Sequence, residues 1–298
     1  VLFRSKMRIN IALEWFLNPD HLPFIAGVSK GFYDRAGMDV QIIVPSEHYD
    51  GLEALKNREI EFAVNEPLHL IEQFSPDMLS LGSFFETRGG VMLSREGERK
   101  LLNGEKIRIS SPVSNDTTDK IAIEILTRYA AKSGVILEPS NVWIEEAGFY
   151  HIANIKSGYD GAWLVFFNFE GVEAIAEGLD TVLIDSAVGG FANFSALDIF
   201  TTKSFFERET DVINGFIAAT KEAMAYIAKN RTEAREMYYD YSGEERSKLT
   251  DEIIDETLKC FNPEFVSSAK KQRETLEFFR ELGVTNLTYN ELSGAFLG

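Results

Sequence analysis

The sequence predicts an α/β protein built from two lobes, and three observations lead to this prediction. Short apolar segments typical of buried strands alternate with segments whose apolar residues recur at helical spacing. This alternation favours a parallel or mixed sheet with helices on both faces. A chain of 298 residues, 45% of them hydrophobic, is long enough for two such lobes of ordinary size.

The expected elements follow one another along the whole chain. The expected strands are Arg8–Trp15, Met38–Pro45, Glu61–Val64, Leu79–Thr87, Gly90–Arg95, Lys106–Pro112, Asn141–Ala147, Tyr159–Phe166 and Thr181–Ala187. The expected helices are His21–Gly37 with a glycine stop signal, 50–60 with Asp50 as cap, 115–134 with Asn115 or Thr117 as cap, and nearly all of the chain from Ser204 onward.

Composition excludes several classes of function. Acidic residues outnumber basic residues 47 to 30, and the resulting net charge of −17 repels the phosphate backbone of a nucleic acid, so no such partner is expected. Cys260 is the only cysteine, which excludes a disulfide within the chain and metal sites built mainly from thiolates. No segment approaches the roughly 20 apolar residues that a membrane helix needs, so no membrane span is expected. No metal site is expected either.

The beginning of the chain leaves the cellular location open. The residues of Leu2–Ser5 match one reading frame of a common sequencing-adapter sequence, and we expect Val1–Ser5 not to be native. If Met7 is the native start, the protein is expected in the cytoplasm. If an export signal precedes this point, a periplasmic or surface-anchored protein is expected.

One long stretch carries a family resemblance. The stretch "ALEWFLNPDHLPFIAGVSKGFYDRAGMDVQII" resembles the opening of the pyrimidine-binding group of type II periplasmic solute-binding proteins, and similar spacing continues through "GLEALKNREIEFAVNEP", "YDGAW" and "KEAMAYIAKNRTEAREMYYDY". The resemblance implies a type II periplasmic-binding-protein-like fold: two α/β lobes joined by two crossing strands, with the ligand in a cleft between the lobes. We expect residues 1–93 plus 193–298 in lobe 1 and residues 94–192 in lobe 2.

The resemblance implies two alternative functions. The group includes receptors for formylaminopyrimidine in thiamine-precursor salvage, which would present a small aminopyrimidine to an ABC transporter permease. It also includes an enzyme that makes hydroxymethylpyrimidine phosphate from its own histidine and bound pyridoxal phosphate. A ligand-sensing relative without a transporter is a third possibility that the sequence does not separate from the receptor.

The residues favour binding over catalysis. Where the resembling enzyme carries its aldimine lysine, this chain has Asn65, and where that enzyme carries the histidine that it consumes, this chain has His69. An amide cannot form a Schiff base. The enzyme's cysteine-rich region corresponds to Gly189–Phe200, which contains no cysteine. We therefore expect no cofactor and no catalytic residue.

The first candidate ligand-binding residues follow the first strand. A flat, amino-substituted ring needs aromatic faces for stacking and carboxylates or amides in its plane. Trp15 ends the first strand, where ligands of α/β sheets usually bind, and Glu14 precedes it. The two cannot both face the ligand along a regular strand unless the strand ends between them. A core position for Trp15 and an exposed strand end for Glu14 are the alternatives.

Further candidates in lobe 1 have structural alternatives of similar weight. His21 either closes over the ligand or caps a turn, and Asn65 either faces the ligand or caps a helix. Glu66 precedes the same helix, and His69 lies one helical turn after Asn65, although an ordinary half-buried histidine is equally compatible. Glu86 belongs to the expected first crossing, where it serves the hinge or the ligand.

The candidates of lobe 2 start in the loop "SSPVSNDTT". This loop holds Ser111 and Asn115 and contains no glycine, which argues against a phosphate site, whereas a simple helix cap would also explain its polar residues. Asp160 and Trp163 lie in "YDGAW", although an aspartate before glycine is usually a turn residue. The remaining candidates are Glu170 in "FNFEG" and Asn193 near the expected second crossing.

Overall fold

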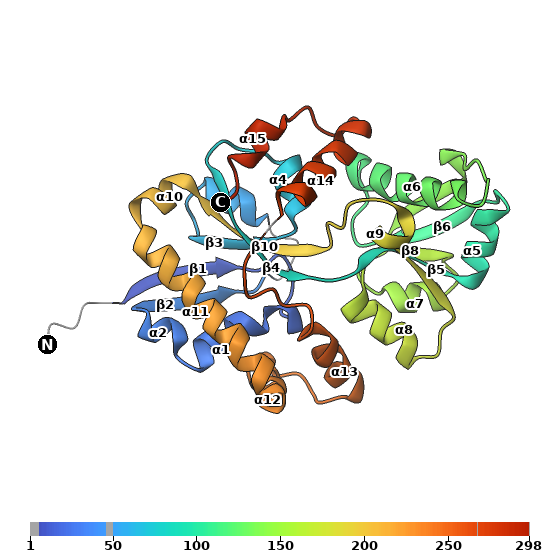
Figure 1. Ribbon diagram of the computed structural model, residues 1–298. Helices are drawn as coiled ribbons and strands as arrows, with labels where there is room; N and C mark the ends of the chain where they lie inside the picture. Colours follow the sequence, from blue (N-terminus) through green and yellow to red (C-terminus); the bar gives the residue numbers. More distant parts are fainter. Residues whose placement is uncertain (1–5, 46–49, 267, 298) are drawn as a thin grey trace, which may run out of the picture. The chain divides into compact units, whose positions relative to one another are not determined.

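The chain folds into two compact units, which Figure 1 traces in the computed structural model. The structure describes residues 6–45, 50–266 and 268–297. Unit 1 comprises Val1–Glu86, Ala196–Ser268 and Thr288–Gly298, and unit 2 comprises Thr87–Ser195 and Ala269–Leu287. Val1–Ser5, which we expect to be non-native, lie outside the described residues.

Unit 1 is built on a sheet of mixed direction. Its five strands have the order β2-β1-β3-β10-β4. They are β1 (Met7–Ala12), β2 (Met38–Ile43), β3 (Phe62–Asn65), β4 (Met78–Glu86) and β10 (Ala196–Thr202). β1 pairs in parallel with β2 and β3, whereas β10 is antiparallel to β3 and β4. The carboxyl ends of β1, β2 and β3 therefore lie at one edge of this sheet.

The helices of unit 1 are η1 (Pro19–His21), α1 (Leu22–Ser29), α2 (Phe32–Arg35), α3 (Gly51–Lys56), α4 (Pro67–Glu72), α10 (Lys203–Arg208), α11 (Thr210–Lys229), α12 (Arg231–Ser242), α13 (Lys248–Thr257) and α15 (Tyr289–Ser293). The long α11 packs against α1 (Figure 1). In the core, the Phe216 ring of α11 stacks on Phe62 of β3 at 4.2 Å and on Tyr33 at 5.1 Å between ring centres. The helix expected at 21–37 is broken at Gly31, whose φ of 68° is left-handed.

Unit 2 repeats the mixed-sheet plan. Its five strands have the order β7-β6-β8-β5-β9. They are β5 (Gly89–Ser94), β6 (Ile107–Ser111), β7 (Val142–Glu146), β8 (Gly161–Phe166) and β9 (Thr181–Asp185). β6 pairs in parallel with β7 and β8, and β5 is antiparallel to β8 and β9. The carboxyl ends of β6, β7 and β8 thus share one edge of the second sheet.

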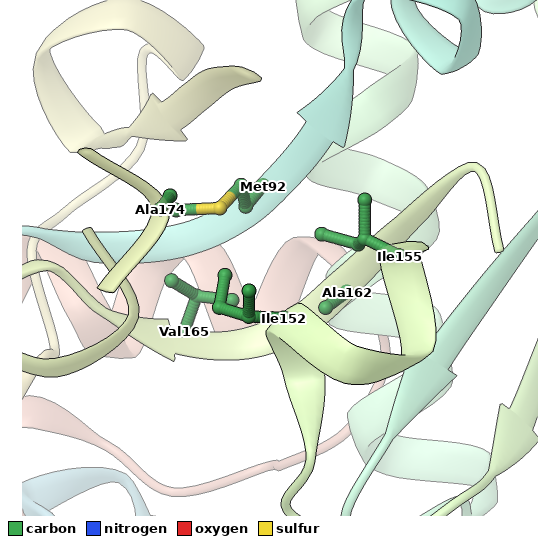
Figure 2. Close-up of a cluster of buried hydrophobic side chains, with 6 residues drawn as sticks. All are labelled: Met92, Ile152, Ile155, Ala162, Val165 and Ala174. Carbon is green, nitrogen blue, oxygen red and sulfur yellow. The ribbon is translucent and has the colours of Figure 1, made fainter. Parts of the chain in front are cut away.

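The helices of unit 2 are α5 (Arg95–Leu102), α6 (Asp116–Ala131), η2 (Pro139–Asn141), α7 (His151–Lys156), the π-helix η3 (Phe167–Gly171), α8 (Val172–Ala176), α9 (Ser186–Gly189) and α14 (Ala269–Glu281). A buried apolar cluster fixes the short helix α7 against the sheet (Figure 2). Its members are Met92, Ile152, Ile155, Ala162, Val165 and Ala174. This packing holds the start of α7 close to β8.

The two units differ from the expected lobes at 87–93, 193–195 and 269–287. β5 was expected in lobe 1, but it pairs with β8 and β9 and so belongs to unit 2. α14 was also expected in lobe 1, and it belongs to unit 2, where the ring of Phe278 lies 6.3 Å from that of Phe191. Both differences arise because unit membership depends on partners distant in the sequence, which a local pattern does not contain. Among the described residues, no helix combines the length and the apolar character that crossing a membrane requires.

Candidate functional site

Glu14 and His21 form a buried pair just after β1. Asn18 caps η1, and its backbone N–H donates to Nδ1 of His21 at 3.2 Å. Because Nδ1 accepts this bond, the ring proton lies on Nε2, which donates to Oε1 and Oε2 of Glu14 at 3.1 and 3.2 Å. The His21 side chain is 0% exposed and that of Glu14 is 9% exposed. His21 thus accepts a hydrogen bond from the backbone of the turn at Asn18 and also orients the Glu14 carboxylate.

Trp15 lies beyond the end of the first strand. Since β1 ends at Ala12, the alternation of side chains along a strand does not restrict the directions of Glu14 and Trp15. The indole is partly buried and makes an edge contact with the Phe16 ring at 5.2 Å. Phe16 itself is 51% exposed. Trp15 is therefore neither a fully enclosed core residue nor a fully exposed one.

Polar residues also follow β3, at the same edge of the first sheet. Asn65 ends β3, and its Oδ1 accepts the backbone N–H of the next residue, Glu66, at 3.0 Å. The N-cap of α4 is Glu66, and no side chain caps this helix, so Asn65 does not act as the helix cap that the sequence offered as an alternative. On α4, Nε2 of His69 lies 3.1 Å from Oε2 of Glu66, and Nδ1 lies 2.9 Å from Oε2 of Glu72. Burial lowers the pKa of His69, but hydrogen bonds and charge from Glu66 and Glu72 outweigh it and raise that pKa to about 10. At neutral pH this histidine is a cation between two carboxylates.

Glu86 and Asn193 lie where the chain passes between units. Glu86 ends β4 with an exposed side chain, and its backbone N–H donates to the carbonyl of Cys260 at 2.9 Å. Within unit 2, Nδ2 of Asn193 donates to the Thr87 carbonyl at 2.9 Å, and its Oδ1 accepts the N–H of Ser195 at 3.1 Å. The Asn193 side chain thus links the chain segment at Thr87 to the segment at Ser195.

The loop after β6 is organised as a helix cap. Oδ1 of Asn115 accepts the N–H groups of Thr117 and Thr118, both at 3.0 Å, and forms a capping box with Thr118. Ser111 is buried, and its hydroxyl donates to the Val113 carbonyl at 2.5 Å. A simple helix cap, which the sequence offered as the alternative to ligand binding for this loop, accounts for these contacts.

Asp160 and Trp163 have partners inside unit 2. Asp160 precedes β8, and its two carboxylate oxygens accept Nζ of Lys100 at 2.7 Å and the backbone N–H of Arg108 at 2.9 Å. It therefore lies at the amino end of β8, away from the carboxyl edge. Trp163 is 1% exposed, meets Phe194 edge to face at 6.1 Å, and has no hydrogen-bond partner for its Nε1 within the described part of the chain.

Glu170 lies at the carboxyl end of β8, together with a histidine that the sequence did not single out. Its Oε2 accepts the backbone N–H of Phe166 at 2.8 Å, and its Oε1 lies 3.9 Å from Nε2 of His151. Burial raises the pKa of Glu170 to about 8, and burial lowers the pKa of His151 to about 4. His151 is thus neutral at pH 7, and Glu170 ionises less readily than an ordinary glutamate. His151 begins α7, and only the fold brings it to Glu170, so no local motif indicated it.

The two sheets therefore offer different chemistry at their carboxyl edges. Unit 1 offers a carboxylate at Glu14, partly buried aromatic surface at Trp15 and the group Asn65, Glu66 and His69. Unit 2 offers the carboxyl group of Glu170, whose pKa burial raises. Groups of this kind bind nitrogen heterocycles through ring faces and N–H donors. Among the described residues, no cluster of 3 or more histidine, cysteine, aspartate or glutamate side chains is arranged to hold a metal ion.

Comparison with known proteins supports the family resemblance. Residues 18–234 match the family model described as "NMT1/THI5 like". The chain is 22% identical to the 4-amino-5-hydroxymethyl-2-methylpyrimidine phosphate synthase of Legionella pneumophila, over 86% of this chain and 81% of that protein. It is 21% identical to the formylaminopyrimidine-binding protein of Halalkalibacterium halodurans, over 84% of this chain and 75% of that protein.

Solved structures establish the fold class. The periplasmic aliphatic sulphonate binding protein of Escherichia coli matches with a TM-score of 0.69 at 12% identity, over 99% of this chain and 93% of that chain. A Candida albicans protein described as having the generic periplasmic binding protein fold matches with a TM-score of 0.66 at 14% identity, over 97% and 96%. The expected type II periplasmic-binding-protein-like class is confirmed.

Proposed function

The chain belongs to the NMT1/THI5-like family, and from this membership we propose that it is a solute-binding protein for a small aminopyrimidine. The names of two relatives share this ligand class: one is a formylaminopyrimidine-binding protein, and the other is a synthase of an aminopyrimidine phosphate. These two relatives are similar to this chain over more than four fifths of its length. The fold class is shared with periplasmic binding proteins, including one for aliphatic sulphonates, so the fold alone does not select the ligand.

The observation that carries the proposal is the Glu14 carboxylate. Both of its oxygens accept from Nε2 of His21, whose other nitrogen is fixed by Asn18. A carboxylate held in this way has remaining lone pairs that accept from the exocyclic amine of an aminopyrimidine. The partly buried Trp15, the next residue, supplies an aromatic face for the same class of ligand.

We further propose delivery of this ligand to an ABC transporter permease from a periplasmic or surface-anchored position. The proposal rests on the binding-protein fold and on the formylaminopyrimidine-binding relative. A cytoplasmic ligand-sensing protein is the alternative, and the native N-terminus together with the neighbouring genes decides between them. A lipid-anchored cysteine or a signal peptide upstream of Met7 favours the receptor.

The residues do not fit the pyridoxal phosphate chemistry of the resembling enzyme. Asn65 stands where the resemblance places the lysine, and its amide oxygen accepts the backbone N–H of Glu66. An amide nitrogen is not a nucleophile for an aldehyde. Because the Legionella relative is named as a synthase, an enzyme of this kind is the second candidate function. Mass spectrometry after incubation with pyridoxal phosphate and iron distinguishes this enzyme from a binding protein.

Isothermal titration calorimetry tests the proposal with aminopyrimidines, flavin-like rings, pyridoxal forms and alkylsulfonates. We expect binding of the aminopyrimidines and at least about a tenfold loss of affinity, roughly 1.4 kcal/mol, in Glu14→Gln. Glu53→Gln is a matched control, because Glu53 is an exposed helix residue whose side chain is 56% accessible. Binding of an alkylsulfonate with no response to aminopyrimidines would reject the proposed ligand class.

A further inference from the structure

Asn65 carries a hydrogen-bond donor for which the fold supplies no acceptor. The residue ends β3 and is 8% exposed. Its Oδ1 accepts the backbone N–H of Glu66 at 3.0 Å, and this bond fixes Nδ2 as the opposite end of the amide. Within the described ranges 6–45, 50–266 and 268–297, Nδ2 has no hydrogen-bond partner. Donors that are nearly buried are almost always paired in folded proteins, so this one indicates a partner from outside the chain.

The neighbouring strand does not use this donor. Asp198 of β10 lies opposite Asn65 in the antiparallel pairing of β10 with β3. The Asp198 carboxylate is fully buried and accepts the hydroxyl groups of Ser80, at 2.6 Å, and of Ser83. The interior of the sheet therefore satisfies Asp198 without Asn65.

Glu14 supplies an acceptor at the same level of the sheet. β1 and β3 are parallel neighbours, and their pairing sets Ala12 opposite Ala63. Glu14 and Asn65 each follow that pair by two residues, at the carboxyl edge of unit 1. An acceptor and a donor thus come directly after two adjacent strands of one sheet.

His21 limits how Glu14 meets a ligand. Nε2 of His21 lies 3.1 and 3.2 Å from the two carboxylate oxygens of Glu14, so it faces the gap between them. The lone pairs that remain lie on the outer sides of the two oxygens. One of these accepts a single N–H, whereas a two-point contact with an amine and a neighbouring ring N–H would need the gap that His21 occupies. Glu14 therefore accepts the exocyclic amine alone, and the ring nitrogen beside the amine needs a partner from another residue.

We propose that Nδ2 of Asn65 donates to the ring nitrogen beside the exocyclic amine, so that Asn65 is a specificity-determining residue for an unprotonated aminopyrimidine. The inference rests on the proposed function and specifies which atom of the ligand is recognised. In a neutral aminopyrimidine this nitrogen is an acceptor, and Glu14 with Asn65 matches the adjacent donor and acceptor of the ligand. A protonated ring would instead place its N–H against the N–H groups of Asn65.

A double-mutant cycle between protein and ligand tests the inference. The two ligands are 4-amino-5-hydroxymethyl-2-methylpyrimidine and its benzene analogue, which keeps the amine while C–H groups replace both ring nitrogens. Asn65→Asp keeps an oxygen for the Glu66 N–H and removes the donor. Calorimetry at neutral pH measures the preference for the pyrimidine over the analogue. We expect this preference to fall at least about tenfold in Asn65→Asp, because the ring nitrogen loses its donor.

Asn57→Asp is the matched control, because it adds the same charge at an exposed position at the end of α3 in unit 1. Its preference for the pyrimidine should stay within about threefold of the wild-type value. If both compounds bind Asn65→Asp more weakly by the same factor, or as tightly as they bind the wild type, the inference is overturned, because a structural role would not distinguish the two ligands.

NMR of the isotope-labelled wild type with the labelled pyrimidine needs no variant. We expect a scalar coupling across the hydrogen bond between Nδ2 of Asn65 and the ring nitrogen beside the amine. A coupling to the other ring nitrogen, or no coupling in the saturated complex, would also overturn the inference. If the wild type does not bind the pyrimidine at all, the proposed function itself is rejected.

Discussion

At the scale of single residues, His69 couples the stability of unit 1 to pH. Its folded pKa of about 10 lies above its ordinary value of 6.5, because two carboxylates outweigh partial burial. The attraction therefore contributes in full below pH 6.5, diminishes above it, and is lost as pH rises through about 10.

We expect His69→Gln to unfold more easily than the wild type by about 1 kcal/mol near pH 6, a value reduced for solvent screening of a ring that is 26% exposed. The difference should shrink toward pH 10. Urea unfolding at several pH values measures it, with Glu72→Gln as a partner variant that should show the same trend. A difference that does not change with pH would show that charge on the imidazole does not stabilise the fold.

We propose that the ligand stacks on Trp15. We expect Trp15→Ala to weaken aminopyrimidine binding by about 1–3 kcal/mol, by analogy with stacking of bases on aromatic side chains. Phe16→Ala is the control, because Phe16 is 51% exposed and makes an edge contact with the same indole. If calorimetry and thermal unfolding find Trp15→Ala unchanged in both affinity and stability, the indole has no part in the site.

At the scale of elements, the loop between β6 and α6 bears on phosphate binding. A phosphate needs several accessible N–H groups and positive charge. Here Asn115 already occupies the N–H groups of Thr117 and Thr118, Pro112 has no N–H, and Asp116 and Asp119 add negative charge. Lys120 is paired with Asp116 at 2.7 Å.

We therefore expect an unphosphorylated aminopyrimidine to bind at least about tenfold more tightly than its phosphate ester, a difference of roughly 1.4 kcal/mol. Calorimetry with the matched pair measures this difference. Asn115→Gly is an informative variant, because it frees two N–H groups and should narrow the gap. Equal affinity of the wild type for both compounds would mean that the phosphate is bound by another part of the chain.

β1 to β9 were predictable from the sequence because their apolar segments carry their own signal, whereas β10 at Ala196–Thr202 was not expected as a strand. The segment Arg8–Trp15 was expected as a strand. The structure has β1 at Met7–Ala12, so the strand begins one residue earlier and ends three residues earlier than expected. Sheet membership was not predictable in the same way: β5 joins unit 2 only through its pairing with β8 and β9. The same limit explains His151, whose neighbour Glu170 lies 19 residues away in the chain.

At the scale of the whole molecule, the fold class alone does not identify the ligand, whereas the relatives point to pyrimidines. The periplasmic-binding-protein-like class accommodates sulphonates in one matched structure, whereas the relatives of this chain include both a formylaminopyrimidine-binding protein and a 4-amino-5-hydroxymethyl-2-methylpyrimidine phosphate synthase. Fold therefore does not decide between binding and catalysis, and particular residues must do so. Asn65 is the most informative of these, because the change from an amine to an amide removes the covalent anchor of the cofactor.

We therefore expect incubation with pyridoxal phosphate and iron to cause no mass loss at His69 and, after borohydride reduction and peptide mapping, no adduct at position 65. Exposed lysines such as Lys248 and Lys270 also react with the aldehyde, so the adduct has to be localised, and Asn65 supplies no amine at the position of the cofactor anchor. Asn65→Lys is the matched comparison: it places an amine at this position, and any adduct that it gains shows that the measurement would detect one. The aminopyrimidine should appear in the native mass spectrum of the wild type as a noncovalent complex. A reproducible mass loss localised to His69 in the wild type would reverse the assignment, because a protein that consumes its own imidazole is a synthase and not a receptor.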